Sequence, residues 1–377
     1  MASYRRNRPV SRRRVARVSD LHFTGVVLPG GDGEFWVSDG AVRFDPPGGP
    51  VTELTGFAVP GYVDAHCHVG IVEDGEPDLV RGRALALEDV AVGVTVIREP
   101  GSDLDTSPLD GQPGLPRFVR MGRHIALVKR YTRGLGEQLE DPSQLVDAVR
   151  RRAAEGHPWI KLVGDWIDRS VGDLAPLWPD DVLAEAVAVA HDAGARITAH
   201  VFGEDALPGL LAAGVDAIEH GSGLTADTIE TMVEKGIGLV PTMIQIENFP
   251  SIAAPAQEKF PTYHRHMTAL HDRRKATFRA AWEAGVAMYA GTDAGGFNVH
   301  GALPREIEAL SAVMPPEEAI AAASWRARQW LGFAGIDDGA PADLVIYDED
   351  PRVALAHGAL PAPSAVVVRG EPADLPR

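Results

Sequence analysis

The sequence predicts an α/β fold: a (β/α)₈ TIM barrel with a small composite β-sandwich domain contributed by both chain ends. Two observations predict it. Eight apolar runs of four to eight residues alternate with longer helical stretches through the middle of the chain, and short β-like runs broken by turn residues occupy both ends. Apolar strands that alternate with helices form a parallel sheet covered on its outside, and eight such units close into a barrel.

The N-terminal end, residues 1–58, is expected to supply the first strands of the sandwich. Its β-like runs are Val15–Leu21, Glu34–Val37 and Ala41–Phe44, separated by turns rich in Gly and Pro. Seven arginines occur by position 17, and no apolar stretch of a secretory signal follows them. We interpret this basic end as a frayed terminus rather than a binding tail.

Residues 59–336 carry the predicted barrel. A doubly wound open sheet is the alternative, but the Gly-rich phosphate turn of that fold is missing after the first strand. The predicted strands are Tyr62–His66, Val94–Arg98, His124–Val128, Trp159–Val163, Arg196–Val201, Ala217–His220, Gly238–Thr242 and Met288–Thr292. The predicted helices are Asp78–Ala91, Pro142–Ala154, Asp180–Asp192, Glu204–Ala213, Thr225–Glu234, Tyr263–Ala284 and Pro316–Leu331, with Asp180 and Thr225 as helix caps.

The C-terminal end, residues 337–377, returns to short strands at Asp343–Tyr347 and Ala365–Arg369. Neither chain end alone offers enough strands to bury a face. We therefore expect the two ends to pair into one domain.

Charge and composition exclude several function classes. The 377 residues include 36 basic and 53 acidic ones, so the net charge of −17 argues against nucleic acid or an anionic membrane as partner. A single Cys excludes an intramolecular disulfide and fits a reducing compartment. No apolar run reaches the about 18 residues that span a bilayer. We expect a soluble cytoplasmic protein that acts on a small molecule; whether it forms a homo-oligomer is left open.

Polar residues end five of the eight predicted strands, where barrel enzymes place their catalytic groups. His66 and His68 are two residues apart on the first strand, so both rings face one side and can reach one metal ion. Cys67 between them faces the opposite way and is expected to pack under the helices. A chance surface pair is the alternative interpretation, because the chain contains 13 His.

Four further strand ends strengthen the metal interpretation. Lys161 lies within an apolar strand, and a buried lysine must be neutralised or paired. His200 and His220 end consecutive strands, and Asp293 ends the last one. Each alone has an ordinary structural interpretation, whereas together they point to one site. Two divalent ions about 3.5–4 Å apart would need an anionic bridge, which a free ammonium cannot supply.

This set of residues, in this order, resembles the amidohydrolase superfamily, most of all its imidazolonepropionase-like and prolidase-like hydrolases. The surrounding phrases resemble it too: Pro60-Gly61-Tyr-Val-Asp64-Ala-His66-Cys-His68, Gly93-Val-Thr95, Gly214-Val-Asp-Ala-Ile-Glu219-His220-Gly221, Gly291-Thr292-Asp293 and Ala342-Asp343-Leu344-Val345. The resemblance covers essentially the whole chain. It implies a binuclear centre held by His66, His68, Lys161, His200, His220 and Asp293, with Lys161 N-carboxylated as the bridge.

The function implied is a metal-dependent hydrolase of an amide, cyclic amide or peptide-like C–N bond, in which a metal-bridging hydroxide attacks the carbonyl and Asp293 is general base and acid. Two Zn²⁺ ions are the default, with Mn, Co or Ni as alternatives. The same centre would also serve lactone or phosphoester hydrolysis. A mononuclear zinc deaminase or imidazolone-type ring hydrolase is the nearest alternative, and a non-catalytic structural barrel a remote one.

Substrate contacts are less defined. The candidates are Tyr131, Arg133, His300 and Arg305, with Trp166, Gln245 and Asn248 as further residues that could line the pocket. The segments after the second and third strands, residues 98–101 and 128–134, depart from the wording usual in the superfamily. Because Arg suits carboxylate capture, Arg133 and Arg305 favour an anionic substrate.

Overall fold

The computed structural model describes residues 20–71, 77–132 and 135–375. The arginine-rich N-terminal end lies outside the described residues, as does Arg133. Within the described part, no helix is both long and apolar enough to cross a membrane.

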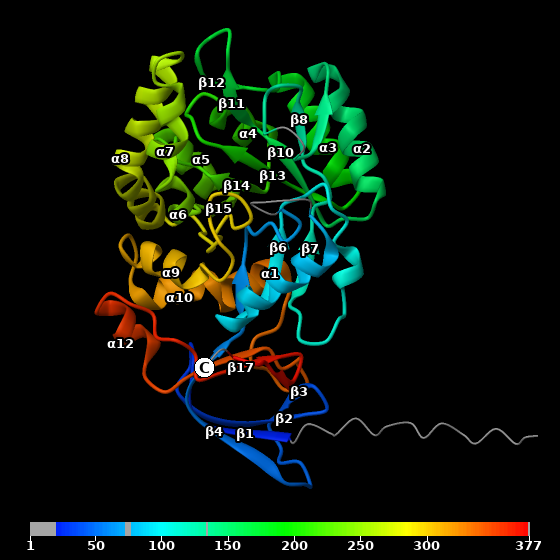
Figure 1. Ribbon diagram of the computed structural model, residues 1–377, viewed down its shortest axis with the longest axis vertical. Helices are drawn as coiled ribbons and strands as arrows, with labels where there is room; N and C mark the ends of the chain where they lie inside the picture. Colours follow the sequence, from blue (N-terminus) through cyan, green and yellow to red (C-terminus); the bar gives the residue numbers. More distant parts are fainter. Residues whose placement is uncertain (1–19, 72–76, 133–134, 376–377) are drawn as a thin grey trace, which may run out of the picture.

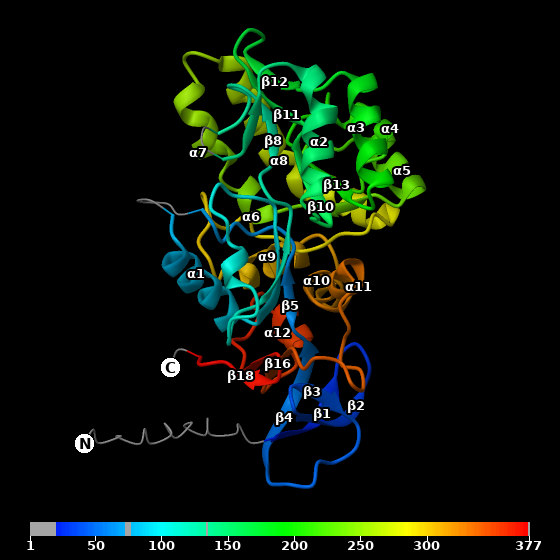
Figure 2. The same cartoon turned by 90° about the vertical axis from the view of Figure 1, so that its right-hand side faces the viewer.

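The two chain ends build one mixed seven-stranded sheet in the order β18-β17-β16-β4-β1-β2-β3. Antiparallel pairing of β4 with β16 joins the ends, and Figures 1 and 2 show the blue and red strands side by side at one end of the molecule. The strands are β1 (Asp20–Val27), β2 (Asp32–Ser38), β3 (Ala41–Arg43), β4 (Val51–Pro60), β16 (Leu344–Tyr347), β17 (Ala365–Val368) and β18 (Glu371–Pro372).

This sheet confirms that the two ends pair. Alternating side chains of its strands, including Phe23, Phe35 and Ile346, enclose a separate apolar core, as expected for a sheet with one buried face. Within the described residues, all of these strands are hydrogen-bonded into a single sheet.

The middle of the chain forms two parallel sheets, ordered β15-β14-β13-β10-β8-β9 and β5-β6-β7. The strands β6, β10, β13 and β14 are almost entirely buried, as expected for parallel strands covered on both faces, and this burial includes polar side chains such as Lys161 and Glu219. Their bounds are β5 (Tyr62–Asp64), β6 (Val94–Glu99), β7 (Arg117–Arg120), β8 (Ile125–Leu127), β9 (Glu137–Leu139), β10 (Trp159–Val163), β13 (Arg196–Val201), β14 (Ala217–His220) and β15 (Gly238–Val240).

The predictions for β10, β13 and β14 are confirmed to the residue, whereas the predicted strand at Met288–Thr292 is wrong. Only one isolated bridge, between Met288 and Leu239, forms there. The backbone of Ala290 explains this difference, because its N–H donates to Ala322 O while its carbonyl accepts from Ala65 N. The segment therefore bonds to several different elements and does not extend the ladder of one strand.

Helices cover the parallel strands, as Figure 1 shows for α2, α3, α5 and α8. Thr225 caps α5 through a capping box, as predicted, but Pro179 and not Asp180 is the cap of α3. The helices are α1 (Leu79–Ala91), α2 (Leu145–Ala154), α3 (Asp180–Asp192), α4 (Leu207–Ala213), α5 (Ala226–Lys235), α6 (Met243–Ile246), α7 (Phe249–Ala253), α8 (Pro261–Ala284), α9 (Leu303–Ser311), α10 (Pro316–Ala323), α11 (Trp325–Leu331) and α12 (Pro351–Ala356), with 3₁₀ turns at Ser107–Leu109, Pro142–Gln144 and Ala254–Ala256.

Two differences from the predicted elements bear on the site. The helix expected over residues 316–331 breaks at Ser324, whose hydroxyl donates to Pro60 O and whose backbone leaves the helical region. A hairpin that the sequence did not predict follows β10, formed by β11 (Asp165–Asp168) and β12 (Asp173–Pro176). This hairpin carries Trp166 toward the functional residues.

Candidate active site and metal centre

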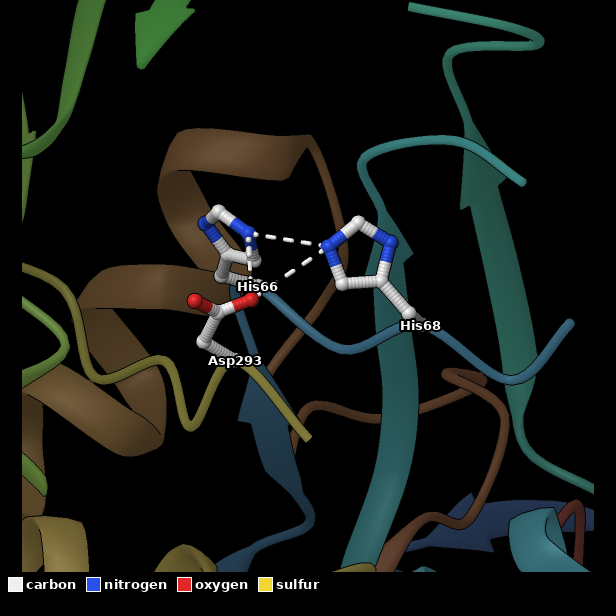
Figure 3. Close-up of side chains that lie close together, drawn as sticks. All are labelled: His66, His68 and Asp293. Atoms are coloured by element: carbon white, nitrogen blue, oxygen red, sulfur yellow. Dashed lines mark hydrogen bonds and ion pairs between the residues drawn. The ribbon is translucent and has the colours of Figure 1, made fainter. Parts of the chain in front are cut away.

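Three predicted ligands converge just beyond the end of β5. His66 Nε2 and His68 Nε2 lie 3.3 Å apart, and Asp293 Oδ1 lies 3.2 Å from the first and 3.3 Å from the second. Figure 3 shows the two rings and the carboxylate turned toward one another. Imidazole nitrogen and carboxylate oxygen at such separations can bind one divalent ion together.

Close backbone contacts bring Asp293 to the histidines. Asp64 accepts hydrogen bonds from His66 N, Thr292 N and the Thr292 hydroxyl, which ties the two segments together. A Cβ at Gly291 would lie 2.8 Å from His66 Cβ, so only glycine permits this approach. Asp293 itself has φ of 53°, a strained conformation for a residue with a side chain, and such strain is characteristic of functional sites.

Second partners orient the rings. His66 Nδ1 lies 2.8 Å from Glu219 Oε2. The other carboxylate oxygen of Glu219, Oε1, accepts a hydrogen bond from the buried Arg98 guanidinium at 2.7 Å. His68 Nδ1 donates to Gly101 O at 2.7 Å. A carboxylate or carbonyl on one ring nitrogen fixes the tautomer that leaves the other nitrogen as a metal ligand.

His220 and His200 extend the cluster. Along β14 the side chains alternate, so Glu219 and His220 would face opposite sides. The φ of 67° at His220 turns its ring back, to 4.6 Å from the His200 ring and 5.2 Å from the His66 ring. His220 Nδ1 bonds the Thr242 hydroxyl at 2.7 Å, which leaves its Nε2 available.

Neither ring nitrogen of His200 has a hydrogen-bond partner, although the residue is buried. A buried unpartnered imidazole is costly. A ligand at this site would supply the missing interaction.

Lys161 lies on β10, paired in register with Thr198 of β13, and only 2% of it is exposed. In a parallel pair, residues in register point to the same face, and the Thr198 hydroxyl on that face bonds Glu219. Burial lowers the pKa of Lys161 to about 8, against the opposing charges of Glu219 and Asp293. A substantial fraction of this amine is therefore neutral near pH 8.

Burial favours the neutral forms of His68, His200 and His220, whereas the charges of Asp293 and Glu219 outweigh burial at His66 and raise its pKa. Burial lowers the pKa of His68, and it lowers that of His220 to about 3. The pKa of His200 is also held well below its usual value by burial and by His220. Burial opposes ionisation of Asp293, but His66 and His68 hold its pKa well below the usual range. A neutral His68, His200 and His220 beside an ionised Asp293 are protonation states that bind divalent metals.

A cavity of about 160 Å³ opens beside the cluster. His68, His200 and Asp293 form its polar floor, and Tyr131, Trp166 and Gln245, all singled out in the sequence, are on its walls. A larger cavity of about 410 Å³, between α8 and α11, contains Arg326, Gln329 and several aromatic residues but no His, Asp or Glu among its described lining residues.

The other predicted substrate residues lie elsewhere. Arg305 is exposed on α9, 3.8 Å from Glu247. His300 is buried away from the cavity lining, where its Nδ1 bonds Asp89 at 2.8 Å and lies 3.7 Å from Cys67 Sγ. Cys67 is fully buried on the side of its segment away from the rings, as expected.

Several residues that build the site had no role in the sequence analysis. Glu219 and Asp64 stand in the quoted phrases, but nothing in the sequence shows that their carboxylates hold His66 and the Asp293 segment. His124, which precedes β8, is buried with Nε2 unpartnered, 4.9 Å from the Tyr131 ring. The Phe202 ring lies 4.3 Å from the His200 ring and is tilted by 55° to it. A strand-end search that includes apolar rings would have found Phe202.

The sequence of this chain is similar to those of known proteins. The sequence model of the amidohydrolase family matches residues 174–373. An uncharacterized protein of Mycobacterium tuberculosis (strain H37Rv) is 50% identical over 358 residues, which cover 94% of this chain and 96% of that protein.

Two solved structures are similar at lower identity. A Xaa-Pro dipeptidase with methionine in its active site superposes with a TM-score of 0.77 at 20% identity, covering 94% of this chain and 99% of the other. A prolidase complexed with N-methylphosphonate-L-proline gives a TM-score of 0.80 at 19% identity, covering 95% and 100%. The α/β fold is therefore that of prolidase-like amidohydrolases.

Proposed function

The chain belongs to the amidohydrolase family, and we propose that it is a metal-dependent hydrolase that cleaves an amide, cyclic amide or peptide-like C–N bond. The observation that carries this proposal is the convergence of His66 Nε2, His68 Nε2 and Asp293 Oδ1 within 3.3 Å of one another beside a cavity. The two similar structures, with methionine or a proline analogue bound, support a small-molecule substrate.

The residues present fit a divalent metal. The Nδ1 atoms of His66, His68 and His220 each have a partner, so their Nε2 atoms are left to ligate, and the buried His200 has two unpartnered nitrogens. Imidazole and carboxylate ligands suit Zn²⁺ first, and also Mn, Co and Ni.

A bound metal would polarise the substrate carbonyl and lower the pKa of the attacking water. Asp293 then accepts a proton from that water as the new C–O bond forms. It delivers the proton to the nitrogen as the C–N bond breaks, so that an acid and an amine leave. Glu219, fixed by Arg98, keeps His66 oriented through this cycle.

We further propose a binuclear centre in which Lys161 is N-carboxylated. The buried amine with its lowered pKa supports this, because the neutral amine attacks CO₂: an N–C bond forms, one proton is released, and the carbamate offers two oxygens. His66, His68, His200, His220 and Asp293 would complete the ligand set.

One observation favours the mononuclear alternative, a zinc deaminase or ring hydrolase. Among the described residues around the site, only His66, His68 and Asp293 have their ligand atoms mutually within 4.8 Å. Three protein ligands and one open position suffice for a catalytic zinc.

Metal counting separates the two. The protein is stripped with chelator, reconstituted with Zn²⁺ with and without bicarbonate, and analysed for metal content, intact mass and hydrolysis of N-acyl amino acids, dipeptides and cyclic amides. The binuclear proposal expects two ions per chain, reactivation accelerated by bicarbonate, and loss of an ion in Lys161→Ala, with partial rescue by small carboxylates. One tightly bound ion and no effect of CO₂ would establish the mononuclear centre.

The proposed function is joined by a proposal about the fold. We propose that β5, β6, β8, β10, β13, β14, β15 and the segment leading to Asp293 close into the (β/α)₈ barrel, with domain limits at residues 59 and 336. The isolated bridges that join Leu239 to Met288 and Cys67 to Ala294 support this closure. Residues 1–58 and 337–377 then form the second domain.

A further inference from the structure

The cavity beside the histidines has an aromatic wall. The Tyr131 ring lies 4.8 Å from Trp166 and 5.3 Å from His200, and Phe202 lies 6.1 Å from Trp166. Ile71, Leu135, Ile252 and Phe297 complete the apolar lining. The volume of about 160 Å³ is close to the about 150 Å³ of an apolar protein cavity that binds benzene.

Within the described part of the chain, no lysine or arginine lines this cavity. Arg130, the arginine of the third loop that the structure describes, is already engaged by the Asp168 carboxylate at 2.9 Å and by Ala175 O at 2.8 Å. Arg305 is exposed beside Glu247. An anionic group in the cavity would therefore find no cationic side chain among these residues to offset its desolvation.

Trp166 is a fixed part of this wall. Arg130 donates to Trp166 O and holds Asp168, while Asp165 accepts from Phe202 N and Gly203 N at 2.9 and 2.6 Å. The other strand of the hairpin is held by His266, whose two nitrogens bond Asp173 and Glu204. A wall anchored on three sides can select substrates by shape.

Gln245 is the neutral polar group of the wall, and its orientation follows from a backbone carbonyl. Thr292 O can only accept, so the Asn298 amide nitrogen points to it at 2.8 Å. The same nitrogen donates to Gln245 Oε1, which Asn248 also approaches at 3.2 Å. The Gln245 amide nitrogen is thereby left to donate on the cavity side.

We propose that this cavity selects an uncharged aromatic or similarly flat apolar group of the substrate, with Trp166 as the specificity-determining wall and the Gln245 amide as donor to an uncharged oxygen of that substrate. The proposal rests on the hydrolase function above and narrows its substrate class to neutral aryl-bearing amides. It differs from the expectation of an anionic substrate, which rested on Arg133 and Arg305.

The test uses pairs of compounds that differ by one carboxylate: benzamides and anilides, each with and without a para-carboxylate, given to the zinc-reconstituted full chain. We expect kcat/KM to be at least about tenfold higher for the neutral member. Binding of the neutral and carboxylated benzamides is measured separately by calorimetry, so that recognition has a readout independent of turnover.

Four variants assign the effect. Trp166→Ala should raise KM or Kd for the neutral aryl compounds about 10- to 100-fold, as expected for losing one aromatic contact surface, while Trp166→Phe retains most of the affinity. Trp36→Ala, in the sheet built by the chain ends, is the matched control and should change neither. Gln245→Leu should weaken binding only of compounds that carry a second carbonyl oxygen besides the carbonyl oxygen of the bond to be cleaved.

Arg133 lies outside the described residues, so the variant Arg133→Ala tests whether this arginine causes a preference for carboxylated compounds. If carboxylated compounds are preferred and Arg133→Ala removes the preference, the proposal is overturned. It is also overturned if Trp166→Ala behaves as Trp36→Ala does. If no compound is hydrolysed but the neutral benzamide binds in a Trp166-dependent way, the hydrolase proposal fails while the specificity proposal stands. If nothing is hydrolysed and nothing binds, both fail.

Discussion

The segment from His66 to His68 separates two clusters that look alike in composition and behave differently. On one side His66 and His68 meet Asp293; on the other Cys67 meets Asp89 and His300, again with three potential ligand atoms within 4.8 Å. In the first cluster the ring nitrogens that face Asp293 have their opposite nitrogens occupied, so acceptor atoms converge. That arrangement calls for a cation.

In the second cluster the hydrogen bonds converge on Asp89, whereas the buried His300 Nε2 has no partner. The Asp89 carboxylate accepts from His300 Nδ1 at 2.8 Å, from Gly301 N at 2.7 Å and from Cys67 Sγ at 3.5 Å. Burial, with the Asp89 charge, raises the pKa of the Cys67 thiol well above its usual value, and a thiol is a poor metal ligand. The comparison teaches that the hydrogen bonds behind each side chain, more than the residue types, distinguish a candidate metal site from a structural cluster.

The largest effect is expected from Asp293→Asn. The amide can still occupy the space but cannot accept the proton of the attacking water, so kcat should fall about 10²- to 10⁴-fold. Circular dichroism and metal analysis should show a folded protein that retains bound metal. Turnover near that of the wild type would mean that the proton goes to another group.

A smaller loss is expected from Glu219→Gln. The neutral side chain no longer fixes His66 or compensates the buried Arg98, and loss of such a partner typically lowers metal affinity about 10- to 100-fold. Metal dissociation constants from competition with a chelator measure this. Glu306→Gln is the matched control, because Glu306 is also buried but accepts from Met243 N and Ile244 N at the start of α6. It should change stability and leave metal affinity intact.

The sequence predicted the candidate ligands better than the residues that hold them in place. His66 and His68 lie just beyond β5, and Asp293 follows a segment that forms only the isolated bridge at Met288, so the three meet as predicted although the last predicted strand does not form. The role of Glu219 depends on a contact with Arg98 across 121 residues, which no local pattern encodes. The strained φ at His220 reverses the side that strand alternation assigns to it.

The predicted fold was reliable where strands are buried on both faces and weak where they are not. β10, β13 and β14 are buried along nearly their whole length, and their limits agree with the predicted ones. The hairpin carrying Trp166 is short, mixed in polarity and held by tertiary contacts with Arg130 and Phe202, so its sequence gave no periodic signal.

Gly295→Ala tests the first cluster through the backbone that positions His68. Gly295 has φ of 102°, and a Cβ there would lie 2.4 Å from His68 O, so the substitution must move His68 or its own segment. We expect activity to fall about tenfold, the scale of a strained ligand segment of about 1–3 kcal/mol. Gly296→Ala, where a Cβ meets nothing within 4 Å, should be nearly neutral. Equal kinetics for the two variants would show that the position of His68 does not limit turnover.

The smallest effect on activity is expected from Asp89→Asn, which acts on the other cluster. The amide would face the His300 and Cys67 donors with its own N–H groups, so the free energy of unfolding should fall by about 1–3 kcal/mol while metal content stays unchanged. Glu88→Gln, one residue earlier, serves as the control on the same helix. Loss of bound metal in Asp89→Asn at full folding would contradict the division between the two clusters.

The pH dependence of that variant gives the finer test. Burial lowers the pKa of His300, but the hydrogen bond and charge of Asp89 outweigh it and raise the pKa above 6.5 overall. A group whose folded pKa is raised contributes stability that is fully present below about pH 6.5 and is lost as the pH rises through the folded value. The stability difference between wild type and Asp89→Asn, measured by denaturant unfolding, should therefore be larger at pH 6 than at pH 9. It should not vanish at pH 9, since neutral His300 still donates through Nδ1; a difference that grows with pH would show that the pair is not ionised as described.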